Sequence, residues 1–267
     1  MHQSTPEIPT IICGSCMIAS SSILNPNAFP EDIEKEVRAA VTKLSLFLTA
    51  KTDLMRSLEY AREDMYKHLN RNWAPYKQAS ATRKDAEVVA YSDGLVYMSN
   101  FNMFLYELKS FLDIFSPILC RLVSNSTSSV HGFNKGNVDG RKISGGKLIN
   151  WVRNLADNSF ENKNDLSEIL LENSTNWINE AVKYRDDLAH YKGFQDLRHM
   201  RISITNGPTA LAQENILDPV MPNGKGLVEY SNETCEKMGT FIEEVLKIVP
   251  NVKNELNSTW EEAKKGL

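Results

Sequence analysis

Cysteine is scarce in this chain, with four residues among 267. That number is too small for a disulfide scaffold in a chain of this length. Cys120 and Cys235 lie in apolar patterns with helical spacing, where a thiol usually serves as a small core residue. Cys13 and Cys16 have C-x-x-C spacing, but no second pair and no nearby histidine completes a zinc site. We therefore expect no metal ion and no cofactor.

Long uncharged apolar runs are also absent, since no window approaches the roughly 20 residues needed to cross a bilayer. Residues 1–24 lack the basic start and continuous apolar stretch of a signal peptide. We expect a soluble, cytoplasmic protein with no membrane partner. Thirty Lys and Arg against 34 Asp and Glu give a net charge of −4. The whole chain is therefore not a polycation that coats nucleic acid, and any phosphate-binding site must be local.

Apolar residues make up 42% of the chain, which is enough to bury a sizeable core. They recur at spacings of three and four, which predicts a mostly α-helical fold. Pro117 is expected to kink the second of two long helices. We expect helices near residues 30–69, 82–124, 147–156, 165–172, 174–193 and 231–249.

The stretches between these helices suggest the domain organisation. Alternating apolar residues over 200–204 predict a short strand, with 226–230 as its partner, in a hairpin insertion near 199–230 before the last core helix. Residues 125–146, rich in Ser, Asn and Gly, are expected to form a loop. We divide the chain into an irregular segment (1–28), a long helix packed on the core (29–84), a helical domain (85–250) and a tail (251–267).

One stretch, residues 131–153, is strongly basic. Its glycines suggest a phosphate loop, but Gly140, Gly145 and Lys147 miss the required spacing and Leu148 replaces the required hydroxyl residue. We expect a flexible basic loop here instead. Asp139 is the one acidic residue of this stretch, against five basic residues: Lys135, Arg141, Lys142, Lys147 and Arg153.

The most informative polar residues lie at the end of the helix expected over 174–193. Asp186 and His190 are four residues apart, so they share a helix face and the carboxylate can hold the imidazole. His190 lies in the last turn, where the negative end of the helix dipole favours the imidazolium. Such a histidine can act as a general acid or base near neutral pH.

Arg185 precedes His190 by five residues, which places it about 140° around the helix and about 7.5 Å along it. One helix cannot easily direct both side chains at one atom. Two copies of the helix packed across a two-fold axis can do so, with the arginine holding a phosphate bidentately. This geometry predicts a homodimer with a composite site.

The pattern Arg185-x4-His190 resembles the signature of the HEPN superfamily (higher eukaryotes and prokaryotes nucleotide-binding domains). In these helical domains, R-x4–6-H commonly marks a metal-independent ribonuclease site. Two further features are similar to that family. A polar residue, here Asp186, follows the arginine, and the motif helix is followed by a hairpin-like insertion and then a last amphipathic helix. The resemblance covers roughly residues 85–250. It includes the ending Ala189-His190-Tyr191 and the long preceding helix with Glu107 to Asp113.

The resemblance implies a HEPN-like bundle that cleaves RNA by transesterification, in which a 2′-hydroxyl attacks the adjacent phosphate and leaves a 2′,3′-cyclic phosphate. His190 would move protons, Arg185 would hold the phosphate, and Asp186 would position one of them. The implied partners are RNA, a second copy of the chain and an inhibitory antitoxin, in toxin or defence biology. Toxin members can carry a modified tyrosine two residues after the histidine; Lys192 stands there, and the tyrosine is Tyr191.

A second interpretation stays open. Arg185 could form a buried ion pair with Asp113 or Glu107 while His190 only caps the helix, which would leave a non-catalytic dimerisation or nucleotide- or RNA-binding module. The motif is also short, and Arg62 to His68 matches it in the first long helix. We interpret that second match as chance, because no helix end is expected beside it.

Overall fold

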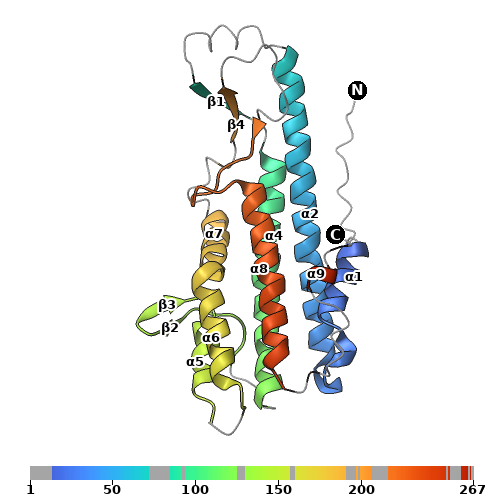
Figure 1. The fold of residues 1–267 in the computed structure, drawn as a ribbon, viewed down its shortest axis with the longest axis vertical. Coiled ribbons are helices and arrows are strands. Elements are labelled where there is room, and N and C mark those ends of the chain that lie inside the picture. Colours follow the sequence, from blue (N-terminus) through green and yellow to red (C-terminus); the bar gives the residue numbers. More distant parts are fainter. Residues whose placement is uncertain are drawn as a thin grey trace.

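The computed structural model confirms a mostly helical chain with small β-sheets (Figure 1). Within the described ranges, no helix combines the length and the apolar character that crossing a membrane requires. The structure describes residues 14–71, 85–91, 94–124, 130–156, 160–190, 197, 199–205, 216–250, 252, 260–263 and 265.

Two long helices form the centre of the molecule, α2 (Glu34–Arg71) and α4 (Leu95–Ser124). They lie side by side along the long axis in Figure 1. Their contact face is aromatic, with the rings of Phe47 and Phe104 stacked at 4.6 Å between centroids. The sequence predicted a helix over 82–124, but α4 begins only at Leu95. Its continuation through Pro117 to Ser124 agrees with the apolar periodicity.

A second helical layer consists of α6 (Lys163–Asn173), a π-helical turn η3 (Ser174–Ile178) and α7 (Asn179–Ala189). The sequence predicted two separate helices here. They form one continuous rod because no glycine or proline interrupts residues 163–189. The rod ends at Ala189 rather than at Gly193, and residues 191–196 lie outside the described part of the chain.

Helix α8 (Leu227–Ile248) packs against these two layers. Its Phe241 ring meets Phe115 of α4 and Trp177 of η3 edge-on, at 6.2 and 6.5 Å between centroids. One buried core thereby joins α4, α8 and the α6–α7 rod. The short helix α5 (Gly146–Arg153) covers α6.

A three-stranded antiparallel sheet lies near one end of the bundle, in the order β1 (Asp85–Tyr91), β4 (His199–Thr205), β5 (Ile216–Leu217). The strand expected over 200–204 is confirmed, but its partners are β1 and β5 rather than 226–230. Residues 227–230 instead begin α8. Their buried positions continue at spacings of three and four down α8, so the helical period decides this segment.

The expected loop over 125–146 contains a second sheet, the hairpin of β2 (Gly136–Val138) and β3 (Arg141–Ile143). Asp139 and Gly140 form its turn with φ of 50° and 77°, the left-handed backbone that a tight two-residue turn requires. The loop expectation is wrong for these residues, and 125–129 lie outside the described part.

Both ends of the described chain are more ordered than expected. The segment called irregular contains α1 (Gly14–Ile23), followed by the short helices η1 (Pro26–Ala28) and η2 (Glu31–Ile33). The tail contains α9 (Trp260–Ala263), whose Trp260 indole lies against Gly239 of α8. Burial of Trp260 to 4% exposure explains why these residues do not form a free tail.

Candidate functional site

The site residues expected from the sequence lie at the end of α7, where two elements meet. Asp186 lies between two cations: its Oδ1 is 3.0 Å from an Nη1 nitrogen of Arg185, and its Oδ2 is 3.1 Å from Nζ of Lys135. Lys135 comes from the segment just before β2. The three side chains are 30–46% exposed, so this is a half-buried ion cluster rather than a solvated pair. Its formal charge is +1.

Arg185 is only partly satisfied in this cluster. Its Nε atom is buried and has no hydrogen-bond partner in the part of the chain that the structure describes. An unsatisfied buried donor costs roughly 1–3 kcal/mol. The Arg185 side chain therefore keeps a hydrogen-bond donor that the described residues do not use.

His190 follows the last helical residue of α7 and presents its side chain to solvent. Its backbone N–H donates to the carbonyl oxygen of Asp186 at 3.1 Å, which closes the last turn. The spacing of four residues predicted that the Asp186 carboxylate would hold the imidazole of His190. The carboxylate is paired with Arg185 and Lys135 instead. Lys135 was not predicted as a site residue, because it is 50 residues upstream of Arg185 and no periodicity connects them.

The alternative partners proposed for Arg185 are engaged elsewhere. Glu107 is buried and pairs with Lys43 of α2 at 2.9 Å. Asp113 pairs with Lys109 and accepts a hydrogen bond from the Phe133 backbone N–H at 2.8 Å. The buried pair of Arg185 with either carboxylate, which the second interpretation had considered, is therefore wrong.

Asp113 nevertheless positions the site indirectly. It fixes the chain at Phe133, two residues before Lys135. Gly132 makes this possible, because its φ is +124° and a Cβ there would lie 2.8 Å from Oδ1 of Asp113. The loop that carries Lys135 is thereby fastened to α4.

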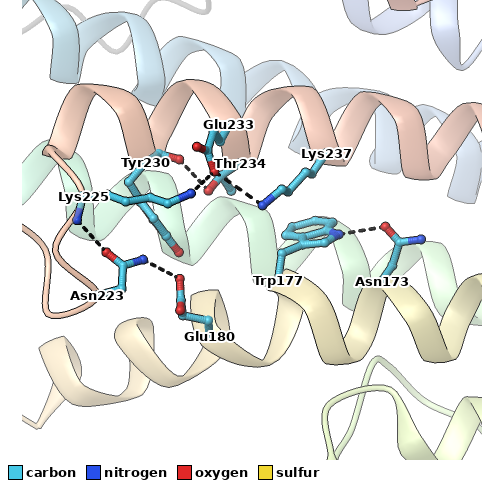
Figure 2. A network of polar contacts seen from close by, with 9 residues as sticks. All are labelled: Asn173, Trp177, Glu180, Asn223, Lys225, Tyr230, Glu233, Thr234 and Lys237. Carbon is cyan, nitrogen blue, oxygen red and sulfur yellow. Dashed lines mark hydrogen bonds and ion pairs between the residues drawn. The ribbon is translucent and has the colours of Figure 1, made fainter.

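A second polar network fastens α7 to the chain before α8 (Figure 2). Nδ2 of Asn223 donates to Glu180 of α7 at 2.9 Å, and Oδ1 of Asn223 accepts from the Lys225 backbone N–H at 3.1 Å. Lys225 in turn pairs with Glu233 of α8, which holds the pKa of that carboxyl below its usual value. The network fixes the helix whose end carries Arg185 and Asp186.

Two tyrosines complete the contact between α7 and α8. The rings of Tyr184 and Tyr230 meet edge-on at 5.6 Å. Burial, reinforced by the nearby charge of Glu180, raises the pKa of Tyr184 to about 12 and raises the pKa of Tyr230 as well. Both phenols therefore stay protonated near pH 7, and their rings anchor α7 on α8.

Comparison with known proteins gave no match among family models, curated proteins or solved structures. The site must therefore be interpreted from its own geometry. Across the described ranges, no three His, Cys, Asp or Glu side chains lie together as metal ligands would. Cys16, Cys120 and Cys235 are buried, and burial raises the pKa of the Cys235 thiol to about 12, as expected for core thiols.

The second sequence match, Arg62 to His68, lies in α2. Arg62 pairs with Asp218 in the segment between β5 and α8. The expectation that no helix end lies beside this match is wrong, because α2 ends at Arg71 and His68 lies in its last turn. Position near a helix end therefore does not distinguish the Arg62–His68 match from the Arg185–His190 match. The two matches differ in the ion-pair partners of their arginines.

Proposed function

We propose that this chain is a metal-independent endoribonuclease that acts as a homodimer, with Arg185, Asp186 and His190 at its site. One observation carries the proposal: Arg185 and Lys135 share a single carboxylate, so one positive charge remains in the last turn before the exposed His190. A surplus cation at an exposed site attracts a phosphodiester, and a neighbouring imidazole can transfer protons near neutral pH. The resemblance to HEPN domains supplies the reaction class, and with it a toxin or defence role restrained by an antitoxin.

In this reaction the RNA 2′-oxygen forms a bond to phosphorus while the bond to the 5′-oxygen breaks. His190 accepts the proton of the 2′-hydroxyl, and a second imidazole, from the other copy, donates a proton to the leaving 5′-oxygen. Arg185 and Lys135 stabilise the charge that develops on the phosphate oxygens. The products are a 2′,3′-cyclic phosphate and a 5′-hydroxyl, and Asp186 positions Arg185.

The surface of α4 supports the homodimer. Val96, Met103 and Tyr106 are 55%, 51% and 53% exposed, and their spacing of seven and three residues places them on one face. Large exposed apolar groups on one face mark an interaction surface. Asp113 lies two turns beyond Tyr106 on the same face and anchors the loop of Lys135, so the face leads to the site. A second copy seated there would add its own helix end to the site.

The homodimer is tested by sedimentation of Met103→Glu beside a matched control, Tyr60→Glu. Tyr60 is 72% exposed on α2, away from the α4 face. We expect wild type and Tyr60→Glu to sediment as dimers, and Met103→Glu to sediment as a monomer with reduced cleavage. Wild type that sediments as a monomer at every concentration would contradict the composite site.

The ribonuclease is tested by incubating end-labelled total RNA with wild type and His190→Ala in EDTA, followed by mapping of the product ends. We expect wild type alone to cut and to leave cyclic phosphates. Absence of cutting, or equal cutting by both proteins, would contradict the proposed function.

A second candidate function is a non-catalytic RNA- or nucleotide-binding module. One observation favours it: the Asp186 carboxylate binds Arg185 and Lys135 and does not orient His190. In that case RNA binds without being cut, and the same assay separates the two functions.

A further inference from the structure

The β2–β3 hairpin carries positive charges that nothing in the described structure neutralises. Arg141, Lys142 and Lys147 are exposed, and no acidic side chain of the described residues forms an ion pair with them. The one carboxylate of the hairpin, Asp139, is already paired with Arg153 at 3.0 Å. The surplus charge therefore faces solvent, in a chain whose net charge is −4.

This hairpin is held rigidly. The backbones at Gly136 and Gly146 touch so closely that a Cβ at Gly136 would lie 2.5 Å from the Lys147 nitrogen. Nδ2 of Asn150 in α5 donates to the Asn137 carbonyl at 2.7 Å. The expectation of a flexible loop is thus replaced by a fixed arm on the side of α5 and α6 (Figure 1).

The arm is also fixed relative to the candidate site. The Ser144 N–H, just after β3, donates to Oδ1 of Asn179 at the start of α7, at 2.6 Å. Lys135, just before β2, pairs with Asp186 near the end of α7. The hairpin therefore contacts α7 at both of its own ends, which fixes the segment that carries the exposed cations relative to the ion cluster of Arg185.

We infer that this hairpin binds single-stranded RNA, with Arg141, Lys142 and Lys147 contacting backbone phosphates on one side of the phosphate held at Arg185 and Lys135. The choice of single strands and the placement of the cut phosphate rest on the proposed function; the attraction of an RNA backbone to the hairpin does not. This segment attracts a polyanion electrostatically, because residues 131–153 hold five basic residues and one acidic residue while the rest of the chain is acidic. Single-stranded RNA is the expected ligand, because the 2′-oxygen, the phosphorus and the leaving 5′-oxygen must lie in line for cleavage. A backbone held in a regular duplex cannot adopt this arrangement.

The test measures binding of a fluorescein-labelled, 2′-O-methylated single-stranded RNA, which cannot undergo 2′-hydroxyl attack, by anisotropy over a salt series. The variant is Arg141→Ala/Lys142→Ala in the full chain. The control is Lys35→Ala/Arg56→Ala, which removes the same charge from exposed positions on α2. We expect the hairpin variant to bind about tenfold more weakly, with a salt slope shallower by about 1.4 for two lost contacts. We expect the control to match wild type.

Three results would overturn the inference: a hairpin variant that binds like wild type, two variants that weaken equally, or a polyglutamate competitor that displaces the RNA as well as unlabelled RNA does. Cleavage is scored separately. A protein that binds RNA through the hairpin without ever cutting it contradicts the ribonuclease and retains the binding surface. Cutting by wild type, with unchanged binding in the hairpin variant, retains the ribonuclease and overturns the surface.

Discussion

Two helices of this molecule, α2 and α7, carry an arginine in their C-terminal part followed five or six residues later by a histidine, and the two arginines have different partners. In α2, Arg62 pairs with Asp218, and both side chains are mostly buried, at 29% and 23% exposure. The pair joins α2 to the chain before α8 and carries no net charge. In α7, Arg185 pairs with its sequence neighbour Asp186, and Lys135 adds a second cation to the same carboxylate.

The difference shows that a short motif gains meaning from the charges around it. Arg62 is committed to a structural contact between distant segments, so a substrate phosphate would have to displace Asp218. Arg185 has a local partner, an unsatisfied Nε and a surplus charge beside it. The α2 motif therefore serves as an internal control for the α7 motif.

A large difference in cleavage rate is expected between variants of the two arginines. Arg185→Ala should lower the rate of RNA cleavage by about 100- to 1000-fold, because it removes the main stabilising charge from the transition state. Arg62→Ala should leave the rate unchanged at temperatures where the protein is folded. Single-turnover cleavage of a labelled RNA measures both, and equal losses in the two variants would remove the distinction between the helix ends.

A smaller effect is expected from Asp186. Asp186→Asn should lower kcat about tenfold, because Arg185 loses the partner that positions it. It should also lower KM, since one negative charge leaves the site. Asp187→Asn is the matched control, because Asp187 pairs with Lys183 at 2.7 Å and touches neither cation of the cluster. A loss of kcat in the control as large as in Asp186→Asn would show that any charge change in α7 suffices.

Arg62→Ala should act on stability instead. Removing one partner of a mostly buried pair should lower the free energy of unfolding by roughly 1–2 kcal/mol, and Tm by about 2–4 °C per kcal/mol. Arg56→Ala breaks a 3.6 Å pair of a 73% exposed arginine and should change Tm by less than about 1 °C. Thermal unfolding followed by circular dichroism measures both, and an unchanged Tm in Arg62→Ala would show that the pair with Asp218 is no structural tether.

The last effect is confined to high pH and concerns how α7 is anchored. The pKa of Tyr184 is raised from its ordinary value of 10 to about 12, so the folded state disfavours the phenolate. The contribution of the protonated Tyr184 phenol to the free energy of unfolding is complete below pH 10. It is lost as the pH rises from 10 to 12. Urea unfolding across this range should show a stability loss that is shallower in Tyr184→Phe and unchanged in the exposed variant Tyr60→Phe. Identical profiles in all three proteins would contradict the anchoring role.

Helical periodicity predicted most of the bundle, because apolar residues at spacings of three and four produce the buried stripes of α2, α4 and α8. It failed at 85–91, where the strand is fixed by pairing with β4, more than 100 residues downstream. It also failed at the β2–β3 hairpin, because strands of three residues leave too short a pattern to detect. Long-range pairing and short elements leave little local signal.

For the candidate site, the sequence located the helix end but not its contacts. Arg185 and Asp186 lie near the end of α7, and His190 follows its last residue, Ala189. Lys135 could not be found this way, since it reaches the cluster only through a loop fastened to Asp113. Nor could spacing alone show that the carboxylate of Asp186 would bind two cations rather than the imidazole.

The central claim is that the end of α7, and not the same motif in α2, cleaves RNA. The most direct measurement compares the initial rates of RNA cleavage by wild type, His190→Ala and His68→Ala in EDTA. We expect His190→Ala to lose about 1000-fold in rate, as loss of a general acid–base group does, and His68→Ala to cleave like wild type. Equal rates for all three proteins, or an equal loss in both variants, would contradict the claim.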